Sequence, residues 1–381
     1  MLDIILILII SGFLIVLGSI IAASVAEALQ YEYSDTLIAA LIAILQTLPE
    51  YAFVVVLSLD GRLDLALASI IGANILLIAL GFPLVVLISY AAKCKGVRED
   101  LAIDLMRENS LEAIFLAISG FYMIFLGFKG FIDIVDSIIL LLIFIIYMVL
   151  VTRLPPEIEF EKPSGLAGKF LERKKLSAMV IVLSIIIVFI PAEFFADAML
   201  ELAAKTLIVT EVFLVAVVAP IISEMPEKLT AYIAATKSED MARLGILNFM
   251  STRINNGTLL ISSMFLAALV AGHVAWEKPL PIGSSLVCSL LFLAGLLSLI
   301  GALTTLDRRI TIQESIGLLV VYILSMFALE DPLYVMPIVV ILAIIAVYII
   351  VKAVKNGRFY WLEDLKHTIQ LCKTKNQFTE S

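Results

Sequence analysis

The sequence is poor in residues that bind soft metals and in residues that carry charge. It contains three cysteines, Cys94, Cys288 and Cys372, and two histidines, His273 and His367, and none has the spacing of a zinc or haem site. Charged residues make up 16% of the chain, without a basic patch that would bind nucleic acid. A Walker phosphate loop and the GxSxG and HExxH motifs are also missing. These absences argue against ATP-driven chemistry, an enzyme and a covalently bound cofactor.

Apolar residues dominate instead. They make up 62% of the 381 residues, which is typical of polytopic membrane proteins. A bilayer core of about 30 Å needs about 20 apolar residues in a helix. Runs of this length predict eleven transmembrane helices, or ten if the weakest run is left out, at 4–29, 35–59, 64–92, 110–128, 131–152, 176–204, 207–236, 242–271, 282–305, 310–329 and 333–352.

Basic residues are distributed unequally between the two sets of loops. Of the 26 Lys and Arg residues, twenty fall on one side, in one alternate set of loops with the adjoining span ends and in the C-terminal tail; four fall on the other side, and two lie deep within spans. Loops rich in Lys and Arg stay in the cytoplasm. We therefore expect a multi-pass protein of the plasma membrane, with its N-terminus outside and its C-terminus cytoplasmic.

Two of the apolar runs contain a proline followed by a glutamate. Pro49 and Glu50 lie in LQTLPEYAF, and Pro226 and Glu227 lie in SEMPEKLTAY. A proline removes a backbone hydrogen bond within a helix, and a carboxylate at bilayer depth costs about 2.5–3.5 kcal/mol on insertion scales. Because both costs occur twice, the sequence predicts discontinuous helices with functional carboxylates at these two positions.

Superposing the two Pro-Glu pairs indicates an internal repeat of five spans. The segment GFKGFIDIVDSIILLLIFIIYMVL in the first half also resembles TTLDRRITIQESIGLLVVYILSMF in the second. Because five is an odd number, the second copy has the inverted topology. We predict an all-α polytopic membrane protein built from two inverted five-helix repeats, at 1–152 and 176–330, with a cytoplasmic linker at 153–175, an additional transmembrane helix at 331–355 and a cytoplasmic tail at 356–381.

Polar side chains gather around each Pro-Glu pair and across the span that follows it. Oxygen atoms of Glu, Gln, Asn, Ser and Thr are the ligands that hard cations such as calcium, sodium and magnesium prefer. The polar residues include Gln46, Thr47, Glu50, Ser69 and Asn74 in the first half, and Ser223, Glu224, Glu227, Asn248, Ser251, Thr252, Asn255 and Asn256 in the second. For Asn74 and Asn256, hydrogen bonding between helices stays open as the alternative role.

The segment LIAILQTLPEYAF, followed by DGRLDLALASIIGANIL, resembles the first alpha-repeat of the sodium/calcium and proton/calcium exchanger superfamily. That family carries GTSLPE, a short loop and then GSNI, and the 24-residue spacing from Glu50 to Asn74 agrees with it. The motifs correspond to residues 43–81 and 214–260, and the match is weaker in the second repeat. The resemblance implies a secondary-active antiporter in the lipid bilayer that exchanges a divalent cation, expected to be calcium, for sodium or protons by alternating access. The sequence leaves the oligomeric state open.

The resemblance also implies roles for individual residues. Glu50 and Glu227 correspond to the family's central metal ligands. Thr47 and Ser223 correspond to hydroxyl or carbonyl ligands of the unwound turns, and the polar residues around them, with Asn74, complete the candidate set. Thr252 and Asn256 would supply the opposing oxygens of the second repeat, if the second motif is allowed to be two residues longer than the first. The remaining candidates are Gln46 and Glu224.

The second repeat departs from the family pattern at two positions. Glu224 stands where a hydroxyl is usual, and Arg253 stands where the asparagine of GSNI is expected. A buried arginine is costly without a counter-charge, so we expect Arg253 to pair with Glu224 or Glu227 and to modulate the site. The alternative hypothesis is a non-transporting membrane scaffold or sensor, in which Arg253 locks the ion site.

Overall fold

The computed structural model describes residues 2–32, 47–93, 102–105, 110–151, 168–170, 174–206, 210–275, 278–282 and 285–357, together with residues 360, 363 and 366. Within this part of the chain, eight helices are long and apolar enough to cross a membrane, and three shorter apolar helices accompany them. Each of the eleven predicted spans overlaps one of these helices. The chain is therefore an all-helical, multi-pass membrane protein, as predicted.

The first half contains α1 (Leu2–Glu32), α3 (Leu48–Leu59), α4 (Leu63–Leu76), the π-helical turn η1 (Leu77–Gly81), α5 (Phe82–Lys93), β1 (Ala102–Asp104), α6 (Ser110–Lys129), β2 (Phe131–Ile132) and α7 (Ile134–Val151). The second half contains α9 (Lys174–Thr206), α10 (Glu211–Ser223), α11 (Met225–Ala235), α12 (Glu239–Asn255), the π-helical turn η2 (Asn256–Leu260), α13 (Ile261–Val270), β3 (Leu280–Pro281), α14 (Ser285–Leu303), β4 (Arg309–Thr311) and α15 (Ile312–Ala328). The short 3-10 helix η3 (Pro332–Tyr334) and α16 (Val335–Lys355) follow.

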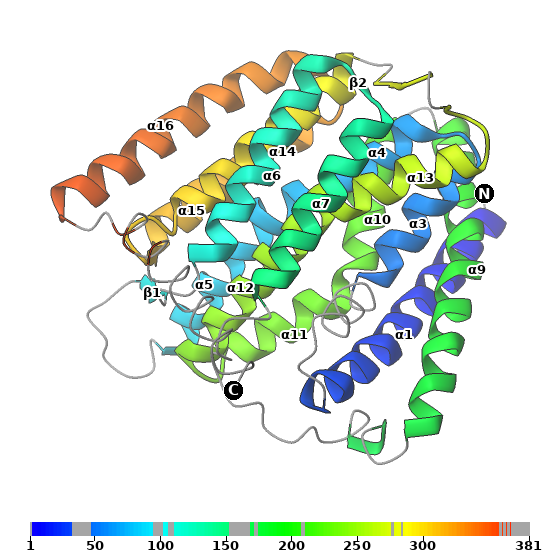
Figure 1. Cartoon of the computed structure of the whole chain (residues 1–381), viewed down its shortest axis with the longest axis horizontal. Coiled ribbons are helices and arrows are strands. Elements are labelled where there is room, and N and C mark those ends of the chain that lie inside the picture. The colour runs from blue at the N-terminus through cyan, green and yellow to red at the C-terminus, as the bar shows by residue number, and fades with distance from the viewer. Residues whose placement is uncertain are drawn as a thin grey trace, which may run out of the picture.

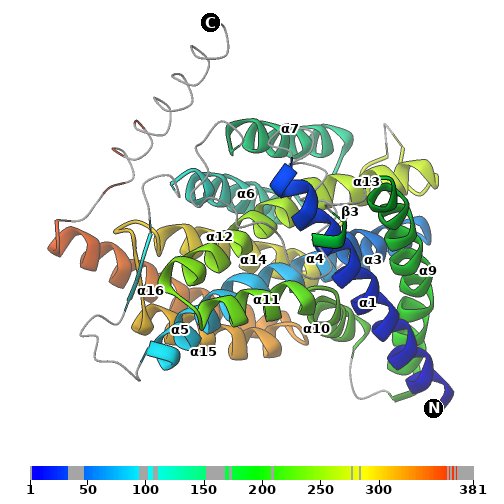
Figure 2. The same ribbon diagram turned by 90° about the horizontal axis from the view of Figure 1, so that it is seen from below.

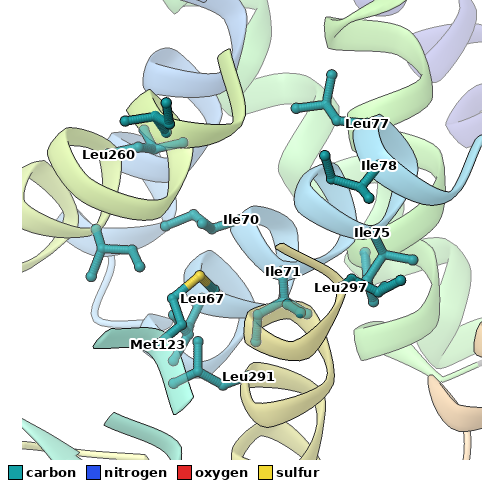
Figure 3. Close-up of a cluster of buried hydrophobic side chains, with 14 of the residues drawn as sticks. Leu67, Ile70, Ile71, Ile75, Leu77, Ile78, Met123, Leu260, Leu291 and Leu297 are labelled. Carbon is teal, nitrogen blue, oxygen red and sulfur yellow. The ribbon is translucent and has the colours of Figure 1, made fainter. Parts of the chain in front are cut away.

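Helix α4 forms the centre of the molecule. Its residues from Leu65 to Leu76 are all buried, and its apolar side chains belong to one buried cluster with Met123 of α6, Leu260 of η2 and Leu291 of α14 (Figure 3). Because these residues are buried on every side, this part of α4 presents no face to lipid and is surrounded by other helices.

The longest helices lie at the edges of the bundle. Helices α1 and α9 run side by side along one edge, and α16 lies at the opposite edge (Figures 1 and 2). Both α1 and α16 expose many large apolar side chains, including Phe13 on α1 and Ile344 on α16. These outward faces are suited to contact with lipid chains, because large exposed apolar areas are rare on soluble monomers.

Two short antiparallel strand pairs join loops from the two halves. In the loops that the distribution of basic residues assigns to the cytoplasm, β1 pairs with β4, so that Ile103 lies opposite Ile310. In the loops assigned to the outside, β2 pairs with β3, so that Ile132 lies opposite Leu280. The structure thus brings together loops that the sequence predicts to share a side, while the orientation in the membrane stays a prediction.

The two halves begin their fifth helix in the same way. At the start of α7, the Asp136 amide donates to Asp133 Oδ1 (3.0 Å) and the Asp133 amide donates to Asp136 Oδ2 (2.8 Å). At the start of α15, the Glu314 amide donates to Thr311 Oγ1 (3.4 Å) and the Thr311 amide donates to Glu314 Oε2 (2.8 Å). Such reciprocal capping satisfies two backbone donors at a helix N-terminus. The weak similarity between these sequence segments therefore reflects a shared local structure.

A lysine neutralises the buried carboxylate of each cap. In the first half, Lys129 Nζ from α6 lies 2.6 Å from Asp136 Oδ2. In the second half, Lys352 Nζ from α16 lies 2.8 Å from Glu314 Oε1 and 3.0 Å from Asp307 Oδ2. In the second half, the counter-charge thus comes from α16, which lies outside the five-helix repeat. In the first half, it comes from α6, which lies inside the repeat.

Candidate cation site

Both Pro-Glu pairs lie in the first turn of a helix. Helix α3 begins at Leu48 and α11 begins at Met225, so Glu50 and Glu227 are each the third residue of their helix. The first turn of a helix has backbone N–H groups without helical partners and a positive dipole, which favours a carboxylate there. Helix α10 ends at Ser223, immediately before this turn. The discontinuity predicted for the second half is therefore present.

The candidates around the first break are buried. Thr47 immediately precedes α3 and is 2% exposed, and Glu50 is 5% exposed. Gln46 lies outside the described residues, and so does the side chain of Glu227. The roles assigned to these two residues stay predictions.

The two halves meet at their motifs in a crossed arrangement. Helix α4 of the first half packs along α10 of the second half so closely that a Cβ atom on Gly72 would lie 1.8 Å from the Ala216 carbonyl oxygen. The end of α12 in turn contacts the start of α3. Each broken helix therefore lies against the long buried helix of the other half, and residues of the two motifs face one another near the middle of the bundle.

Asn255 makes the second of these contacts. Its Nδ2 donates to Thr47 Oγ1 (2.9 Å), and its Oδ1 accepts a hydrogen bond from the Tyr51 hydroxyl (2.8 Å). One amide thus fixes the first turn of α3 to α12. Asn255 belongs to the polar residues of the second half but was not predicted as a ligand. Its neighbour Asn256 was chosen from family spacing, and only the rotation of α12 distinguishes the two.

A π-helical turn follows the buried helix in both halves. Asn74 precedes η1 by three residues, and Arg253 precedes η2 by three residues. The two turns therefore put Asn74 and Arg253 at equivalent places, which agrees with the two extra residues allowed in the second repeat. Such turns widen a helix locally and are frequent at functional sites.

The two candidate asparagines are fully buried. Asn74 Nδ2 lies 4.0 Å from the sulfur of Met123, whereas Asn74 Oδ1 and both amide atoms of Asn256 have no hydrogen-bond partner within the described chain. Buried polar atoms are nearly always paired with protein, water or a ligand. These unpaired amide oxygens fit a hard cation, and their burial is the property that a ligand at the bilayer midplane requires.

Glu224 does not pair with Arg253 as we expected. Its Oε2 forms an ion pair with Lys228, one helical turn further on, and its Oε1 has no hydrogen-bond partner in the described structure. Arg253 instead donates from Nη2 to the Ala294 carbonyl oxygen (3.0 Å) and lies 3.1 Å from the Met123 sulfur. Of the two expected partners, Glu224 is thus paired with Lys228, and the pair of Arg253 with Glu227 stays a prediction because the side chain of Glu227 lies outside the described residues.

The remaining candidates contribute less. The Ser223 hydroxyl is half-buried and lies 3.5 Å from the Pro220 carbonyl oxygen, and Thr252 is 7% exposed on α12. Among the described residues, no group of three or more His, Cys, Asp and Glu side chains is arranged to hold a metal ion. A cation would therefore depend on a mixture of carboxylate, amide, hydroxyl and backbone oxygens.

Comparison with known proteins gives a consistent result. The family described as "Sodium/calcium exchanger protein" matches residues 4–153 and 176–330. The crystal structure of the H+/Ca2+ exchanger CAX is 21% identical, with 98% of this chain and 92% of that chain covered and a TM-score of 0.82. The sodium-calcium exchanger NCX_Mj soaked with 100 mM Na+ and 10 mM Sr2+ is 18% identical, with 85% and 98% covered and a TM-score of 0.56. No curated protein matches the chain.

The solved structures have low sequence identity, so their likeness shows the fold alone. The family match covers both predicted repeats and most of the chain, and it includes both Pro-Glu pairs. The chain belongs to the sodium/calcium exchanger protein family.

Proposed function

We propose that this protein is a secondary-active antiporter that moves a divalent cation, with calcium as the expected cargo, in exchange for sodium or protons. The observation that carries the proposal is the buried Glu50, held at the first turn of α3 beside residues of the other half. Ionisable side chains within a membrane protein are rare and mark ion pathways, so a buried glutamate in this position supports a role in binding a transported cation. The family membership and the exchangers of similar fold support the same function.

In this mechanism Glu50 and Glu227 bind the dehydrated cation from opposite halves. Asn74 and Asn256 offer amide oxygens, and Thr47 offers a hydroxyl or carbonyl oxygen. Alternating access would come from movement of the edge pair α1 and α9 across the central helices. Helices α1 and α9 contact mainly each other and α3, so their remaining faces are directed toward lipid and do not hinder movement of the pair. We assign the N-terminus to the outside of the plasma membrane from the basic residues.

The test is cation flux in proteoliposomes. Glu50→Gln and Glu227→Gln each keep the shape of the side chain but remove its charge, so both should abolish uptake. Glu211→Gln is the matched control, because Glu211 is an exposed glutamate in the first turn of α10 and should keep wild-type flux. Wild-type uptake in either motif variant would refute the assignment. Comparing calcium, magnesium and manganese under imposed sodium or proton gradients identifies the cargo and the coupling ion.

The alternative of a locked scaffold depends on an ion pair between Arg253 and a site carboxylate. Glu224 pairs with Lys228 instead, so one of the two expected locks is not formed. A locked site would give neither flux nor a cation-dependent change in melting temperature. The same proteoliposome preparation therefore distinguishes the two functions.

A further inference from the structure

Arg253 puts a permanent positive charge into the core of the protein. Its side chain is completely buried, and it stands before η2 where the first half has the neutral Asn74 before η1. An arginine does not lose its proton in proteins. The two halves therefore differ by one full charge at equivalent positions.

Uncharged groups hold this guanidinium. Its Nη2 contacts the Ala294 carbonyl oxygen and the Met123 sulfur, while Nε and Nη1 have no hydrogen-bond partner within the described chain. Gly257 makes room for it, because a Cβ atom there would lie 2.6 Å from Nη1. No described acidic side chain forms an ion pair with Arg253: Glu224 acts on it only at longer range, and the side chain of Glu227 lies outside the described residues.

The charge lies close to the candidate ligands. Arg253 Nη2 and Asn74 Nδ2 contact the same sulfur at 3.1 and 4.0 Å, so no more than about 7 Å separates the two nitrogens. Asn256 follows one turn later on the same helix. The second basic residue of the region, Lys228, is already paired with Glu224. Arg253 is therefore a described basic side chain that lies beside a candidate ligand, Asn74, and is not itself held in an ion pair with a described acidic group.

We propose that Arg253 is a resident cation that limits the site to one mobile cation at a time. The inference rests on the proposed function and names the residue that sets cation occupancy. Two carboxylates, Glu50 and Glu227, attract cations, and the guanidinium cancels one of their two charges. With calcium bound, the site already carries a net positive charge, so it repels a sodium ion that would bind beside it. Two unit charges about 8 Å apart, at an effective dielectric constant of about 20, repel each other enough to weaken binding about 30-fold.

The experiment measures the melting temperature of the purified protein during titration with calcium, with sodium or choline added at saturating calcium. In wild type, sodium should give no stabilisation beyond that of choline. Arg253→Gln should lower the calcium midpoint at least 30-fold and should gain a sodium-dependent stabilisation. Arg253→Lys keeps the charge and should behave as wild type within about threefold. A purely structural role predicts weaker binding in Arg253→Gln, not tighter binding.

Three results would overturn the inference. They are unchanged or weaker calcium binding in folded Arg253→Gln, a gain of binding in Arg253→Lys, and additive stabilisation of wild type by sodium at saturating calcium. The last result needs no variant and decides the question if Arg253→Gln does not fold. Calcium flux in wild type with additive sodium binding contradicts this inference alone. Absence of both flux and calcium binding in wild type refutes the proposed function, and the inference with it.

Discussion

Substitution of Gly72 by alanine tests the close contact between α4 and α10. The added Cβ atom would lie 1.8 Å from the Ala216 carbonyl oxygen, whereas ordinary contacts are 3.4–4 Å. Because the obstacle is backbone, no rotamer change relieves it, and the two helices must separate by about 1.5 Å. Overpacking of this kind costs about 1–3 kcal/mol, of which the higher helix propensity of alanine returns at most about 1 kcal/mol.

The effect on transport should exceed the effect on stability. Helix α4 carries Asn74 two residues after Gly72, and α10 leads directly to Glu224, so separating the helices pulls ligands of the two halves apart. Misplacement of functional groups by about 1 Å can cost about 100-fold in rate. We expect Gly72→Ala to insert into the membrane, to melt at a lower temperature and to lose at least tenfold in proteoliposome flux. In the control Gly317→Ala, the new Cβ meets Ile345 at 3.4 Å and should be tolerated. Wild-type flux in Gly72→Ala would refute the close approach of the two helices.

Three further substitutions test individual contacts. Asn255→Ala removes both hydrogen bonds that fix α3 to α12. Because each is worth about 1 kcal/mol, we expect lower thermal stability and slower flux. Stability equal to wild type would contradict the bridge. Lys352→Met leaves the buried carboxylates of Asp307 and Glu314 without their counter-charge and should destabilise the protein by about 3–5 kcal/mol in thermal or denaturant unfolding. A wild-type stability would refute the role of α16 in neutralising them. Lys228→Met should likewise destabilise through the buried Glu224, whereas Lys205→Met, which breaks an exposed pair of the same spacing, should change stability by less than about 1 kcal/mol. Equal effects of the two would show that burial of the Lys228 pair is unimportant.

Local patterns predicted much of the fold. The apolar runs predicted the helices, because a segment in lipid must satisfy its own backbone hydrogen bonds and a helix does so within the segment. Pro226 predicted the break between α10 and α11, since proline cannot donate a backbone hydrogen bond. The turns η1 and η2 were not predicted, because the glycines in LIALG and NGTLL are general turn signals that do not identify a π-helical turn. The ion pair between Glu224 and Lys228 was not predicted, although a lysine four residues later is a recognised helical partner.

The sequence by itself determined the eleven apolar segments, the repeated Pro-Glu pairs and the odd charge of Arg253, because these depend on residue type and spacing along the chain. Tertiary structure alone decided which polar groups meet. Asn255 and Thr47 are 208 residues apart, and their hydrogen bond exists because α12 and α3 cross with particular rotations about their axes. Packing of entire helices sets such rotations, so local spacing cannot distinguish Asn255, which bridges the halves, from Asn256, whose amide has no hydrogen-bond partner within the described chain.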